Sequence, residues 1–157
     1  MKRKWEIDDK ISKFLLVTES RLGRFYLLPK IHKRLHNVPG RPVISNCGYV
    51  TENISSFLDF HLQPTNDFLR QLKDLPPLPE NVLLCSLDVV ALYPSIPNKG
   101  GGEAMKEAFD EREIKKVSTE SLLNLAEIVL KSNFFEHGSK TYKQKKGTAI
   151  GTKFAPP

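Results

Sequence analysis

The sequence contains little cysteine and no long apolar segment, and each absence excludes a class of protein. Its two cysteines, Cys47 and Cys85, are too few for a disulfide framework and lack the CxxC spacing of a zinc cluster. We expect both thiols to be buried. The longest apolar runs, such as 82–84 and 128–130, are far shorter than the roughly 20 residues that a membrane-spanning helix needs. These absences predict a soluble protein without a membrane partner.

The N-terminus also lacks a secretory signal. The segment MKRKWEIDDK is charged and has neither an apolar core nor a small-residue cleavage site, which predicts an intracellular location. The 157 residues, 39% of them hydrophobic, suit one globular domain or a piece of one that can bury a core.

Acidic residues are missing from the last part of the chain, where none follows Glu136. Almost the whole net charge of +6 comes from the lysines of this part, Lys140, Lys143, Lys145, Lys146 and Lys153. A second basic stretch contains Lys30, Lys33, Arg34 and Arg41. Two basic segments that fold onto one cleft suit a phosphate backbone. Because lysine-rich surfaces are usually just solvated, charge alone leaves a solvated surface as the default interpretation and nucleic-acid binding as the alternative.

The hydrophobic pattern predicts a mixture of helices and strands without internal repeats. Apolar residues at helical spacing predict helices within 1–20, from 53 to 62, through 104–109 and up to 130, the last one capped by Ser118 or Thr119. Glycines 100–102 predict a flexible turn, and the prolines of 74–80 predict an extended connection. The runs 25–29 and 42–47 predict a β-hairpin with a long basic tip, and 134–144 predicts a second hairpin.

The run VLLCSL at 82–87 predicts a buried strand that ends at Asp88. A carboxylate in that position projects a hard oxygen ligand into a cleft, as a magnesium ion that handles phosphates requires. Tyr93 follows five positions later, where its ring can form the floor of a nucleotide pocket. Taken alone, a strand-end aspartate is more often structural, and a tyrosine is more often part of the core.

Four segments occur in order between residues 25 and 157: FYLLPKIHK, GRPVIS, LDVVALYPSIP and GTAIGTKFAP. In order and approximate spacing they resemble the fingers and palm motifs of the reverse transcriptases of Penelope-like retroelements. Each motif alone is weak, but four in register argue against coincidence. The resemblance implies an α+β fold, a partial right-hand polymerase with a fingers region at 1–80 and a partial palm at 81–157. That palm is expected to hold an incomplete antiparallel sheet with packed helices.

The resemblance implies roles for individual residues. Asp88 resembles the first catalytic aspartate, which with the backbone carbonyl of Val89 coordinates Mg²⁺, or Mn²⁺ in its place, for nucleotidyl transfer. Tyr93 is similar to the residue that excludes the ribose 2′-hydroxyl. Arg41 resembles the arginine that grips the triphosphate of the incoming deoxynucleotide, which a forked guanidinium suits. The alternative for Arg41 is a surface ion pair.

Further contacts with the nucleotide, the RNA template and the DNA primer are implied in the same way. Lys30 is similar to a fingers lysine near the triphosphate, although loop lysines are usually solvated. Gly151 resembles a palm glycine that lets the backbone approach the nucleotide. At Ile150, where many reverse transcriptases carry glutamine, a side-chain hydrogen bond is excluded. Nucleic-acid contacts are expected at Lys33, Arg34, Lys143, Lys145, Lys146 and Gly147. A nuclear location is implied by the family.

The sequence lacks the family's next motif, a strand turn with two adjacent aspartates, and it lacks a thumb. The pair Asp8–Asp9 lies in a charged helical context and is predicted to be a solvated helix turn. Two-metal transfer needs ligands that hold both ions about 4 Å apart. We therefore expect a fragment of an RNA-directed DNA polymerase that is inactive by itself, from a truncated element copy or an incomplete gene model.

Two other interpretations remain open. The chain is alternatively a non-enzymatic nucleic-acid-binding remnant of a retroelement, or a decayed insertion with an exposed core and molten behaviour. A small metabolic enzyme is disfavoured, because His32 and His36 lack the intervening glutamate of a zinc protease.

Overall fold

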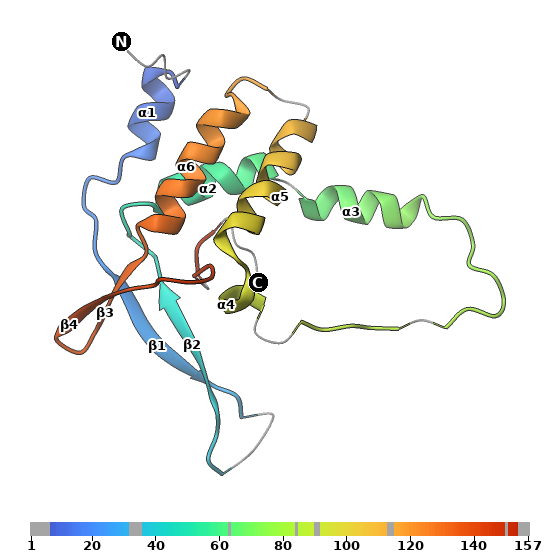
Figure 1. The fold of residues 1–157 in the computed structure, drawn as a ribbon, viewed down its shortest axis with the longest axis horizontal. Coiled ribbons are helices and arrows are strands. Elements are labelled where there is room, and N and C mark those ends of the chain that lie inside the picture. The colour runs from blue at the N-terminus through green and yellow to red at the C-terminus, as the bar shows by residue number, and fades with distance from the viewer. Residues whose placement is uncertain are drawn as a thin grey trace.

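The computed structural model describes residues 7–31, 36–62, 64–83, 85–89, 92–112, 115–149 and 151–153. These ranges contain both helices and strands, which confirms the predicted mixture of the two (Figure 1). They are α1 (Asp9–Leu15), β1 (Gly23–Pro29), β2 (Gly40–Ser45), α2 (Glu52–Leu62), α3 (Pro64–Lys73), α4 (Leu92–Ser95), α5 (Asn98–Glu111), α6 (Thr119–Lys131), β3 (Phe134–His137) and β4 (Lys140–Lys143). No helix in the described ranges combines the length and apolarity needed to cross a bilayer.

The four strands form one sheet in the order β2-β1-β3-β4. Both predicted hairpins are confirmed, since β1 pairs antiparallel with β2 and β3 pairs antiparallel with β4. The two hairpins are joined by a short parallel pairing of β1 with β3, in which Gly23 lies opposite Phe135. The sheet is therefore mixed rather than antiparallel, and it combines strands from both ends of the chain. The helices between β2 and β3 supply the long connection that a parallel pair requires.

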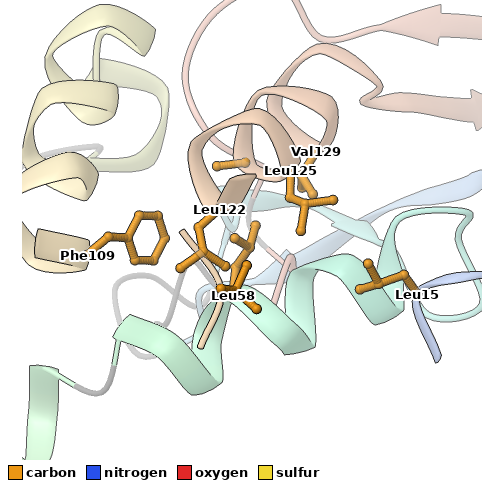
Figure 2. Close-up of a cluster of buried hydrophobic side chains, with 8 residues drawn as sticks. Leu15, Leu58, Phe109, Leu122, Leu125 and Val129 are labelled. Carbon is orange, nitrogen blue, oxygen red and sulfur yellow. The ribbon is translucent and has the colours of Figure 1, made fainter. Parts of the chain in front are cut away.

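The core lies among α1, α2, α5 and α6, as Figure 2 shows. The apolar residues of α6 recur at the spacing of one helical face, and this face packs on α2 and α5. Leu58, Phe109 and Leu122 are completely buried. Burial of such a side chain stabilises the fold by roughly 1.5–3 kcal/mol. The prediction that the α6 stripe forms core is confirmed. The buried cluster consists of Leu15, Leu58, Phe109, Val117, Leu122, Leu125, Ala126 and Val129.

Polar side chains cap two of these helices, and the cap at Ser118 was predicted from the sequence. The Ser118 hydroxyl accepts a hydrogen bond from the Ser121 amide at 3.2 Å, at the start of α6. The Asp8 carboxylate accepts one from the Ile11 amide at 2.7 Å, and Asp9 lies exposed in the first turn of α1. Such bonds satisfy amides that the helix leaves without a partner. The interpretation of Asp8–Asp9 as a solvated helix turn is confirmed.

The flexible turn predicted at glycines 100–102 is wrong, because these residues lie inside α5. The helix begins after Pro97, whose carbonyl accepts from the Gly101 amide at 2.9 Å. Each glycine costs a helix about 1 kcal/mol relative to alanine. This local cost is opposed by tertiary packing, because α5 packs on α6 and α2 and buries Phe109 completely.

The buried strand predicted at 82–87 is also wrong for its described residues. Leu83 is 90% exposed and Leu87 is 95% exposed, and neither lies in a strand. A strand needs a hydrogen-bonding neighbour, and none of the described strands pairs with this segment. Cys85 lies in the same uncovered segment and Cys47 in the turn after β2, so both thiols are exposed and free, contrary to the prediction.

Candidate nucleotide and nucleic-acid site

The β1–β2 hairpin brings Lys30 and Arg41 close to each other at its far end. Leu28 pairs with Arg41 across the hairpin, and the Lys30 amide donates to the Pro39 carbonyl at 2.9 Å. The Arg41 side chain is exposed and Lys30 is half-buried. Two predicted phosphate-binding cations thus lie at one end of one hairpin. The predicted nucleic-acid contacts Lys33 and Arg34 lie outside the described residues.

Gly151 packs directly against β2. Its φ of +113° is one that other residues rarely adopt, and a Cβ at this position would lie 2.4 Å from the Ile44 carbonyl oxygen. The glycine is therefore needed for the approach of residues 151–153 to the GRPVIS strand. Packing within the chain therefore explains the glycine at position 151. Its predicted contact with a nucleotide stays a prediction.

Tyr93, on α4, is held beside the turn that contains Gly147. The Thr148 amide donates to the Tyr93 carbonyl at 2.9 Å, and Gly147 adopts a φ of +73° in the same turn. The Tyr93 hydroxyl is buried and forms no hydrogen bond in the described structure. Buried hydroxyls normally have a partner, so the polar end of this side chain is left unsatisfied. The contact joins the LYPSIP segment to the glycine-bearing turn.

Asp88 lies in the uncovered segment and is exposed, as is Val89 at 59%. Within the described residues Asp88 forms no hydrogen bond or ion pair. The described residues also contain no group of three or more His, Cys, Asp or Glu side chains that could hold a metal ion. One exposed carboxylate does not fit a centre for two magnesium ions.

A pocket of about 210 Å³ lies where β2, the start of α2 and residues 151–153 meet. Polar groups of Ser45, Glu52, Thr152 and Lys153 contribute to its lining. The Glu52 carboxylate accepts from the Gly48 amide at 2.7 Å and lies 3.6 Å from the Lys153 ammonium. The motif GRPVIS ends at Ser45, and the motif GTAIGTKFAP contains Thr152 and Lys153. No signal in the sequence indicated that Glu52 would lie beside them.

The predicted lysines of the second hairpin are exposed. The Lys143 ammonium lies over the Phe134 ring, 5.2 Å from its centroid, while Lys145 and Lys146 follow β4 toward the Gly147 turn. The Gln144 side-chain amide donates to the Lys146 carbonyl at 2.9 Å, which orders this stretch. The three cations form a continuous basic strip that leads from the sheet to the turn.

Three contacts therefore link the four sequence motifs. The first two motifs pair as β1 and β2, Gly151 of the fourth packs on β2, and Thr148 of the fourth bonds to Tyr93 of the third. Comparison with protein-family models, curated proteins and solved structures finds no match to this chain.

Proposed function

We propose that this chain is the nucleotide- and nucleic-acid-binding part of a reverse transcriptase of the Penelope-like type, comprising the fingers and the first part of the palm. The observation that carries the proposal is the convergence of the four motifs through β1–β2 pairing, the Gly151–Ile44 approach and the Thr148–Tyr93 hydrogen bond. Residues of the first, second and fourth motifs line one pocket, where segments about a hundred residues apart in the chain meet. The family resemblance assigns these same segments to one nucleotide-binding cleft.

The charged groups divide the work of binding. Arg41 provides a planar fork of donors that suits the oxygens of a deoxynucleoside triphosphate, with Lys30 as a second cation nearby. The basic strip Lys143, Lys145 and Lys146 suits the phosphate backbone of an RNA template or a DNA primer. Both groups belong to the same sheet and its continuation, with the cations for the triphosphate at the β1–β2 hairpin and those for the primer–template after β4.

Nucleotidyl transfer in the family depends on two magnesium or manganese ions, which stabilise the attacking and leaving oxygens. Asp88 is the residue of this chain that would contribute to their coordination. Because the described residues contain no group of three or more His, Cys, Asp or Glu side chains that could hold a metal ion, no catalytic step is assigned to this chain. The proposal is that these 157 residues bind substrates and do not extend a primer by themselves.

Binding is tested with a fluorescent RNA–DNA primer–template and a fluorescent deoxynucleoside triphosphate, measured by anisotropy. Arg41→Gln is expected to weaken triphosphate binding about tenfold, the loss of hydrogen bonds to a charged group. Lys10→Gln, which removes an exposed cation on α1, is the matched control and is expected to change little. Equal affinities for the triphosphate in both variants would contradict the assignment of Arg41.

Catalysis is tested separately by incubating the purified chain with primer–template, deoxynucleotides and Mg²⁺ or Mn²⁺. No extension is expected. DNA synthesis that disappears in Asp88→Ala would show that the chain is an active polymerase, and it would overturn the binding-only proposal.

A second candidate is a remnant that binds nucleic acid without any polymerase role. The exposure of Asp88 favours it, as does the absence from the described residues of any group of three or more potential metal ligands. Salt-sensitive binding of nucleic acid that survives both Asp88→Ala and Arg41→Gln, with no affinity for triphosphates, would select this candidate over the first.

A further inference from the structure

One face of the sheet carries a row of rings that the proposed function does not use. Residues alternate between the two faces of a strand, and the pairing of β1, β3 and β4 places Phe25, Phe135, His137 and Tyr142 on the same face. The ring of Phe135 lies 5.6 Å from that of Tyr142 and 6.0 Å from that of Phe25, with planes 19° and 30° apart. His137 meets Phe25 edge-on at 4.8 Å. We call these four residues the aromatic face.

The row ends in solvent at Tyr142. This residue lies on β4, at the edge of the sheet, and 43% of its surface is exposed, whereas Phe25 and Phe135 are half-buried. In Figure 1 the β3–β4 hairpin lies to the side of the helices, away from α3 and α5. The inner rings hold Tyr142 in position, and its ring offers a surface on which another flat group can stack.

The charges around this face have one sign. Among the strand residues that alternate onto it, Lys140 is basic and none is acidic, since Glu136 lies on the opposite face. The chain continues from β4 into Lys145 and Lys146, and no acidic residue follows Glu136 in the sequence. This positive charge complements a polyanion. It does not complement a second copy of this chain, whose face would carry the same positive charge. Flat bases joined by phosphates combine the two properties that the face would recognise.

We propose that the aromatic face binds single-stranded nucleic acid, with one base stacked on Tyr142 and Lys140 beside the adjoining phosphate. A single strand is required because the faces of bases in a duplex are covered by their neighbours. The inference deepens the proposed function, since it names the form of nucleic acid that the sheet takes. It is separable from it, because Arg41 and the pocket residue Tyr26 lie on the opposite face of the sheet.

The test uses the full chain and labelled RNA of about 12 nucleotides, as a single strand and as a duplex. Tyr142→Leu is expected to weaken single-strand binding at least about fivefold, the lower end of one base–aromatic stack, while Tyr142→Phe retains the affinity. Lys140→Gln is expected to reduce the salt dependence by about one phosphate contact. Phe14→Leu, which changes an exposed ring on α1, is the control and should bind as the unaltered chain does.

Three results would overturn this inference. They are unchanged single-strand affinity in Tyr142→Leu, a loss of duplex affinity in Tyr142→Leu as large as the loss of single-strand affinity, and self-association that Tyr142→Leu abolishes while RNA affinity stays the same. A measurement on the unaltered chain guards against a folding defect: RNA containing 5-iodouridine should photocrosslink at Tyr142, and crosslinks found only elsewhere would also contradict the proposal. Loss of triphosphate binding in Arg41→Gln bears on the proposed function alone, so the two can fail independently.

Discussion

The helical layer and the segment that carries Asp88 contain similar apolar residues but differ in what surrounds them. Leu122 on α6 is completely buried against α2 and α5, whereas Leu87, one residue before Asp88, is 95% exposed. Both were predicted to be core. The difference teaches that an apolar run is buried only where another element is present to cover it, and that stability should reside in the helical layer.

The largest expected effect tests directly whether the two regions differ in their contribution to stability. Leu122→Ala removes a side chain from the buried cluster and should lower the free energy of unfolding by about 2–5 kcal/mol. Leu87→Ala makes the same chemical change in the exposed segment and should alter it by less than about 0.5 kcal/mol. Denaturant titration measures both. Equal destabilisation would mean that the segment before Asp88 is covered in solution.

The second prediction compares alanine substitutions of two glycines, one in the candidate site and one in the helical layer. Gly151→Ala forces a side chain against the Ile44 carbonyl at a φ of +113°, and we expect a loss of about 1–3 kcal/mol. Gly102→Ala lies in α5 with no atom within 4 Å of the added Cβ, so it should stabilise by about 0.5–1 kcal/mol. Thermal unfolding should therefore shift in opposite directions. If Gly151→Ala left the stability unchanged, this result would contradict the close approach of the fourth motif to β2.

The next effect concerns the Ser118 hydroxyl at the start of α6, which accepts from the Ser121 amide and donates to the Ser121 hydroxyl. Ser118→Ala removes the acceptor for the Ser121 amide and should destabilise the protein by about 1 kcal/mol. Ser139→Ala, in the exposed turn between β3 and β4, is the matched control and should change little. If the two variants unfold alike in denaturant, the cap does not stabilise α6.

Local signals predicted most of the elements, because they depend on spacing and caps within one segment. The α6 stripe, the cap at Ser118 and both hairpins follow from periodicity and turn residues alone. The errors concern residues whose state depends on distant parts of the chain. The glycines of α5 are helical because Phe109 packs in the core, and the run before Asp88 is exposed because no described strand lies beside it.

In the candidate site, the sequence likewise indicated single residues but not the contacts between distant segments. The sequence indicated Arg41, Tyr93 and Gly151 individually, but it did not predict that Gly151 would meet the Ile44 carbonyl or that Tyr93 would accept a bond from the fourth motif. The parallel pairing of β1 with β3, which assembles the aromatic face, joins residues more than a hundred positions apart. No local pattern carries that information, because pairing of this kind depends on how the helices between the strands pack.

The smallest expected effect lies in the helical layer, at His61 near the end of α2. Burial, and then the positive charge of Arg112, lower the pKa of His61 below its usual value of about 6.5. The unfolded chain therefore binds a proton at His61 more readily than the folded chain does. The stability that follows from this is fully present above about pH 6.5 and is lost as the pH falls through the pKa of the folded state.

Thermal unfolding at about pH 7.5 and about pH 5 should show a lower melting temperature in acid, and His61→Gln should reduce that difference. The variant removes a titrating group and keeps a polar side chain, so the comparison between the two proteins cancels the contribution of the carboxylates. An unchanged pH dependence in His61→Gln would mean that the His61 ring is as hydrated in the folded chain as in the unfolded one. That outcome would mean that the end of α2 is exposed to solvent, as the segment before Asp88 is, and is not part of the buried core.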